Sequence, residues 1–164
     1  MTFTEYHDAI LAAVRAEFGA NVATVEAYDE TILGKLETPA VLLAIDGTRF
    51  EDRFWECEVH LLCCLNRKTN REHVELHEFA AQMAELVEEN DFGAETASNP
   101  TEINTSPSGL PEPAIVVRDV EFIQRVNIDK FNPAALSDWI TYHSEKAMGG
   151  NEAPVAEDTV TLPQ

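Results

Sequence analysis

The segment from Phe54 to Asn66 constrains the fold more than any other part of the sequence, because apolar and polar side chains alternate along it. Alternation with a period of two is the pattern of a β-strand with two unlike faces. The second face starts polar, at Glu56, Glu58 and His60, and turns apolar later. The first face carries Trp55, Cys57, Val59, Leu61, Cys63 and Leu65. The pattern therefore predicts a long strand with one buried face.

Apolar residues at three- and four-residue spacing predict helices before and after this strand. The first helix is expected over residues 4–18, with Thr4 as its N-cap and Gly19 as its stop. The second is expected over residues 72–90. A third helix is expected to begin at Pro133 and to end at the glycine pair 149–150.

The remaining strands are predicted over residues 22–28, 40–45 and 114–126. The pair Asp46-Gly47 is a turn signal that would end the strand over 40–45. Residues 94–113 are rich in proline and serine and predict a long loop, with a short strand near Ile103 as an option. Together the elements predict an α+β fold: a mostly antiparallel β-sheet with two or three helices packed on one face. We expect a single domain over 1–148 and a flexible C-terminal arm over 149–164.

The charge of the chain excludes several partners. Its 164 residues include 30 Asp and Glu against 11 Lys and Arg, which gives a formal net charge of −19. Binding of nucleic acid or of an anionic membrane needs clustered cations, so neither is expected. The sequence contains no apolar run long enough to span a bilayer and starts without a signal-peptide pattern, so we expect an intracellular protein. Its three cysteines are expected to be reduced and buried.

Motifs that carry chemistry are absent from the sequence. It has no phosphate-binding glycine loop and no nucleophile elbow. His73 and His77 are spaced like metal ligands on a helix, but Val74 stands where the zinc-protease pattern needs glutamate. Cys57 and His60 would point to opposite faces of their strand and could not close a metal site. We therefore predict no catalytic residue, no cofactor and no metal, and a protein that is not an enzyme.

Positive charge is the patterned feature of an acidic chain. Arg49 and Arg53 precede the alternating strand, and Arg67, Lys68 and Arg71 follow it. If the strand pairs with its predecessor, the two groups lie at opposite ends of the pair. One interpretation is a scatter of solubilising charges. The sharper one is a subunit interface, because copies of an acidic chain need cross-subunit ion pairs or apolar contacts to offset their repulsion.

Four features follow one another along residues 5–145. An N-terminal amphipathic helix precedes a strand introduced by proline, Thr38-Pro39-Ala40-Val41-Leu42-Leu43. The alternating strand then leads into the helix Leu76–Val87, and a Pro-rich loop precedes Pro113-Ala114-Ile115-Val116-Val117. In element order, length and texture this resembles the tail terminator (tail completion) proteins of long-tailed bacteriophages and related phage-tail-like particles.

The resemblance implies a structural virion protein of the tail and neck, assembled in the host cytoplasm. Such proteins form a ring, typically of six subunits, that caps the tail tube, stops its polymerisation and joins it to a neck or connector protein. DNA would pass the lumen without specific binding, and an acidic lining would repel its phosphates. The strand with its basic rims could supply intersubunit contacts. The arm could add its segment around Val160 and Leu162 to a neighbour's sheet edge, so these two residues complete the candidate interface.

Two other functions fit the same sequence. Type III secretion chaperones are also small, acidic proteins of mixed helices and strands, and they hold an extended segment of an effector as dimers. Another neck or connector component of the phage is the second alternative. Co-purification separates the first from a terminator, and microscopy of particles that lack the protein separates the second.

Overall fold

The computed structural model describes residues 1–67, 72–93, 98–109 and 113–128, apart from the side chains of Ile32 and Glu72. Two α-helices and five β-strands form there, with short 3-10 turns at Gly19–Asn21 and Glu30–Lys35. In chain order the elements are α1 (Phe3–Phe18), β1 (Thr24–Ala27), β2 (Ala40–Glu51), β3 (Phe54–Asn66), α2 (Glu72–Glu88), β4 (Thr101–Ser108) and β5 (Ile115–Val126). The predicted third helix and the arm over 149–164 lie outside the described residues.

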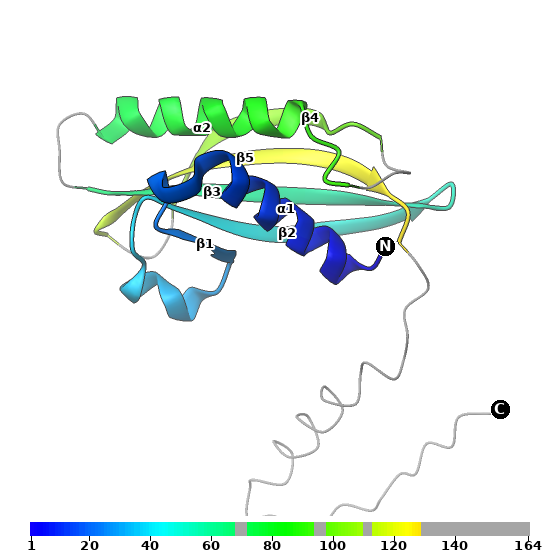
Figure 1. Cartoon of the computed structure of the whole chain (residues 1–164), viewed down its shortest axis with the longest axis horizontal. Helices are drawn as coiled ribbons and strands as arrows, with labels where there is room; N and C mark the ends of the chain where they lie inside the picture. Colours follow the sequence, from blue (N-terminus) through cyan, green and yellow to red (C-terminus); the bar gives the residue numbers. More distant parts are fainter. Residues whose placement is uncertain (68–71, 94–97, 110–112, 129–164) are drawn as a thin grey trace, which may run out of the picture. The chain divides into compact units, whose positions relative to one another are not determined.

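The five strands form one sheet in the order β1-β2-β3-β5-β4 (Figure 1). Only the β1–β2 pair is parallel, and the other three pairs are antiparallel. Residues of both helices join one core cluster with the sheet, so α1 and α2 cover the same face. The prediction of an α+β fold with a mostly antiparallel sheet and helices on one face is confirmed.

The alternation of β3 produces the core. Cys57, Val59, Leu61 and Cys63 are fully buried on the face that α1 and α2 cover. The register places Val41 and Leu43 of β2 and Val120 and Phe122 of β5 beside them. The helices close this layer with Tyr6, Ile10, Val14, Ala80, Met83 and Val87. Period-two burial in the sheet and period-3.6 burial in the helices thus meet in one apolar layer.

A smaller apolar cluster lies on the opposite face of the sheet, at one end. It explains why the second face of β3 turns apolar at Leu62 and Cys64. Leu33, from the 3-10 turn Glu30–Lys35, is buried in the same cluster. The other members are Ala40, Leu42, Ile115 and Val117.

The start of α1 differs from the prediction. Thr2, rather than Thr4, is the N-cap: its hydroxyl accepts from the Glu5 backbone N–H, and the Glu5 carboxylate accepts from the Thr2 backbone N–H. This reciprocal capping box decides between the two threonines, because only Thr2 has a glutamate three residues later. Gly19 ends the helix at φ 52°, as expected.

The predicted turn at Asp46-Gly47 is wrong. The pair lies inside β2, where the register shifts between Ile45 and Gly47 and makes a β-bulge. A Cβ at Gly47 would lie 2.7 Å from Glu58 Oε2 and 3.1 Å from Glu58 Cβ, so glycine permits the close approach of the two strands. The chain turns instead at Asp52 and Arg53, both of which have positive φ.

The predicted long loop over 94–113 contains β4. Thr101–Ser108 pairs antiparallel with β5 and forms the outer edge of the sheet. The sequence left a short strand near Ile103 as an option, and the structure forms an eight-residue strand there. Pro107 is tolerated in it because an edge strand needs only one set of ladder hydrogen bonds.

A buried polar relay connects α1 to β5. The Tyr6 hydroxyl donates to Gln124 Oε1 at 2.6 Å, and Gln124 Nε2 donates to the backbone oxygens of Asp91 (3.3 Å) and Ser98 (3.2 Å). Gln124 is fully buried, and burial raises the pKa of the Tyr6 phenol. The relay thus ties the helix to the segments that flank α2 and β4.

Tyr6→Phe should reduce the free energy of unfolding by about 1–2 kcal/mol, because it leaves the buried Gln124 oxygen without its donor. Urea unfolding followed by circular dichroism measures the change. The matched control Tyr28→Phe alters a half-buried phenol elsewhere and should cost less. An unchanged stability for Tyr6→Phe would contradict the relay's contribution.

Candidate functional site

The face of the sheet opposite α1 and α2, here called the open face, is polar over its middle. His60 of β3 lies beside Glu121 of β5 in the register, and Asp119 is the next β5 residue on this face. The His60 Nδ1–H donates to Asp119 Oδ2 at 2.8 Å. Its Nε2 lies 3.7 Å from Glu58 Oε1 and 3.9 Å from Asp46 Oδ2. One imidazole is therefore surrounded by carboxylates.

This environment shifts the pKa of His60 upward. Burial of the ring lowers the pKa, but the hydrogen bond that His60 donates to Asp119 and the negative charges of Asp119, Asp46 and Glu121 together outweigh it. The His60 and Asp119 side chains are only 16% and 13% exposed, so solvent screens the pair weakly. The arrangement favours a charged imidazolium that holds two strands together.

His60→Gln should destabilise the fold more at pH 6 than at pH 9. A pKa raised by folding adds stability that is fully present below the unfolded pKa, near 6.5, and is lost as the pH rises through the folded pKa. The difference in unfolding free energy between the native chain and the variant should be roughly 1–2 kcal/mol at pH 6. Urea unfolding at both pH values measures it. A difference that grows toward pH 9 would contradict the assignment.

The tip of the β2–β3 hairpin exposes an aromatic surface. Phe50 is 62% exposed and lies with its ring centroid 5.3 Å from that of Trp55, which in turn contacts Phe3 of α1 at 5.4 Å. On the other side of the hairpin, the Arg125 guanidinium lies 5.5 Å from the Phe54 ring centroid. These contacts hold the tip to the body of the domain and leave Phe50 outside.

The fold places the described residues of the predicted interface at opposite ends of the β2–β3 pair. Arg49 and Arg53 lie at the tip end of the β2–β3 pair, and Arg67 follows β3 at the opposite end, as the predicted pairing requires. Arg49 Nη2 lies 3.4 Å from Glu51 Oε1, an exposed ion pair of small energetic value. Four of the predicted residues lie outside the described part of the chain: Lys68, Arg71, Val160 and Leu162.

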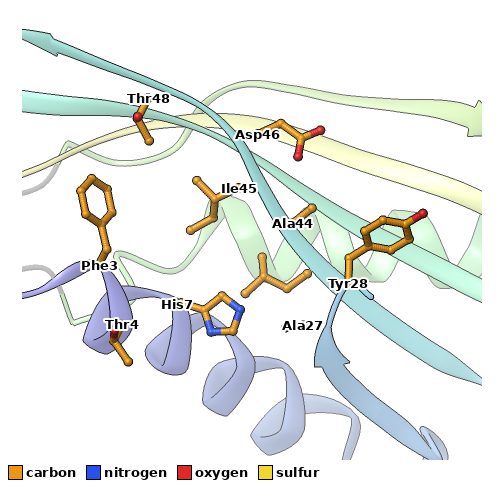
Figure 2. Close-up of a pocket in the computed structure, with 10 residues that line it drawn as sticks. Phe3, Thr4, His7, Ala27, Tyr28, Ala44, Ile45, Asp46 and Thr48 are labelled. Carbon is orange, nitrogen blue, oxygen red and sulfur yellow. The ribbon is translucent and has the colours of Figure 1, made fainter. Parts of the chain in front are cut away.

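A groove of about 670 Å³ runs between α1 and the outer edge of β2 (Figure 2). The groove forms because β1 pairs with β2 only as far as Ala27, which lies opposite Leu43, whereas β2 continues to Glu51. Leu43 and Ile45 line it with apolar groups. Its other lining residues are Phe3, Thr4, His7, Ala27, Tyr28, Ala44, Asp46 and Thr48. An open strand edge beside an apolar floor can accept an extended peptide segment.

The cysteines are structural in this arrangement. All three are free and buried, as predicted. Burial raises the pKa of Cys57 to about 11 and that of Cys64 to about 12, and it raises the pKa of Cys63 as well. A nucleophilic or metal-binding thiol needs a lowered pKa, so these thiols behave as small apolar groups. Cys57 faces the helices and His60 the open face, as the strand spacing predicts.

His73 and His77 lie on the exposed side of α2. Within the described residues, no group of three or more His, Cys, Asp or Glu side chains is arranged to hold a metal ion. Sequence reasoning singled out His60 only for a metal site and missed its pairing with Asp119. The signal was a histidine on the polar face of a strand, but its partner depends on the β3–β5 register.

Comparison with known proteins assigns no family. No protein-family model matches the chain, and no curated protein matches it. In the described part of the chain, no helix combines the length and the apolar composition needed to cross a membrane.

Proposed function

We propose that the chain is a structural virion protein, a tail terminator that forms a ring, typically of six copies, at the end of a phage tail tube. The observation that carries the proposal is the exposed aromatic hairpin tip: Phe50 projects from a well-anchored strand pair, between Arg49 and the turn residue Arg53. Phe50 and the half-buried Trp55 form an aromatic surface at the tip, and aromatic residues are enriched in protein–protein interfaces. The ring would cap the tube, stop its polymerisation and join the tail to a neck protein.

The charge of the chain supports a role around passing DNA. Each copy carries a formal charge of −19, so six copies would surround a lumen with strongly negative protein. Such a lining repels phosphates and lets the duplex pass without binding. The same charge also opposes association of the copies, so their interface must supply apolar or ionic contacts.

Two features of the described surface are suited to those contacts. Arg49 and Arg53 at the tip end and Arg67 at the far end of the hairpin offer cations to acidic neighbours. The groove beside β2 offers an open strand edge over an apolar floor, which an extended segment of a neighbouring copy can extend as a further strand.

Phe50→Ser should lower the association constant of the copies at least about tenfold, because truncation of a hot-spot residue at the centre of an interface costs about 2 kcal/mol or more. Sedimentation velocity measures the oligomer distribution. Val74→Ser is the matched control, since Val74 is 59% exposed on α2 away from the tip. Both variants should unfold near the native temperature. Equal assembly of Phe50→Ser and the native chain would contradict a role of the tip in the ring.

The effect of the chain on the length of tail tubes tests whether it acts as a terminator. Tail tube protein of the same phage, polymerised alone, should give long tubes, and addition of the chain should give short tubes that carry a ring at one end in electron micrographs. Tubes of unchanged length without end rings would contradict the proposal. Particles that lack the protein should carry overlong or headless tails, whereas leaking filled heads would indicate a connector.

The groove beside β2 favours one alternative, a chaperone for an effector segment of type III secretion. Its open edge and its floor of Leu43 and Ile45 fit a bound extended peptide. Purification from the native host distinguishes the two functions. A dimer that carries an effector segment would support the chaperone, and a ring that binds tube ends would support the terminator.

A further inference from the structure

A basic pocket of about 400 Å³ lies between the first turns of α2 and the β4–β5 pair. Arg67, His73, His77 and Arg118 line it, and none of the described lining residues is Asp or Glu. In a chain with nearly three acidic residues for each Lys or Arg, two arginines and two histidines around one hollow depart sharply from the average surface. The remaining lining residues are small or apolar, so this pocket concentrates positive charge.

Arg118 lies in the pocket with weak contacts only. Its Nη2 lies 3.4 Å from the Thr105 backbone oxygen and 3.5 Å from Thr105 Oγ1, and its Nη1 lies 3.4 Å from His77 Nε2. Its Nε is buried and has no hydrogen-bond partner among the described groups. A guanidinium is a planar fork of donors that matches the two oxygens of a carboxylate or the oxygens of a phosphate. The contacts that Arg118 makes here do not use that fork fully.

The surroundings of Arg118 add to the preference for an anion. His77 stands beside its guanidinium, and Arg67 supplies a second one on the pocket wall. The pocket also adjoins the N-terminal turns of α2, where the helix dipole favours negative charge. An oxyanion in the pocket would accept hydrogen bonds from several donors and lower the mutual repulsion of the two guanidinium groups.

We propose that this pocket binds an oxyanion and that its ligand is a surface carboxylate of a neighbouring copy of the chain. The choice of a carboxylate follows from charge: with 30 acidic residues, a second copy presents this group over most of its surface. The identity of the ligand rests on the proposed assembly, whereas the binding of an oxyanion does not. The pocket would then act as the positive half of an ion pair between copies.

Inorganic phosphate is the probe for the site itself. Titration of the chain with phosphate should shift the His77 ring resonances in NMR spectra saturably, whereas chloride at equal ionic strength should not. Arg118→Gln and the exposed-site variant Arg67→Gln should each weaken phosphate binding at least about tenfold. Arg118→Lys should restore part of it, because a single charge remains without the planar fork. Lys35→Gln, which removes one exposed charge outside the pocket, should bind as the native chain does.

Competition in the assembled state identifies the ligand. If a neighbour's carboxylate occupies the pocket, phosphate should dissociate the oligomer in sedimentation velocity more strongly than chloride of equal ionic strength. Arg67→Gln should weaken assembly, and Lys35→Gln should not.

Different results would contradict the oxyanion site, the neighbour's carboxylate as ligand and the proposed ring. Absence of saturable phosphate binding in the native chain, or equal binding in Arg67→Gln, overturns the oxyanion site. Phosphate binding that leaves the oligomer intact overturns the neighbour's carboxylate as ligand and indicates a free anion. A chain that binds phosphate yet stays monomeric contradicts the proposed ring while supporting the site.

Discussion

The burial of the β3 alternation beneath α1 and α2 is the interaction on which the rest of the structure depends. Leu61 and its neighbours on the covered face are fully buried, and β3 pairs with β2 on one side and with β5 on the other. A shift of one residue in β3 would place these apolar groups on the open face and Glu56, Glu58 and His60 in the core. The same register that fills the core therefore fixes the side chains available for function.

The parts of the molecular surface outside this core differ in their charge. The open face holds a histidine among carboxylates, the hairpin tip exposes Phe50 against Trp55, and the pocket beside α2 gathers two arginines and two histidines. In a chain of formal charge −19, each positive feature is a point where another acidic surface can approach at a favourable energy. Copies of one chain associate only where two of its own surfaces are complementary. The proposed ring and the proposed oxyanion pocket both depend on such a match between basic and acidic surfaces.

The sequence predicted the elements with strong periodicity and missed those set by tertiary context. β3 agrees with its predicted bounds, and its length allowed the opposite ends of the hairpin to be placed. The edge strand β4 was predicted only as an optional short strand near Ile103, because Pro107 and its polar neighbours lack an apolar pattern, and pairing with β5 supplies the order instead. The pair Asp46-Gly47 indicates a local bend of the backbone, but the sequence does not determine whether that bend is a β-bulge or a turn. The pocket around Arg118 and His77 joins residues 41 positions apart, which no local pattern reveals.

The native mass of the full chain in solution, measured by mass spectrometry with and without tail tube protein, decides whether the chain assembles into a ring. We expect a closed ring, typically of six copies, formed by the chain alone or on addition of the tube protein. A monomer at high concentration in both measurements would contradict it.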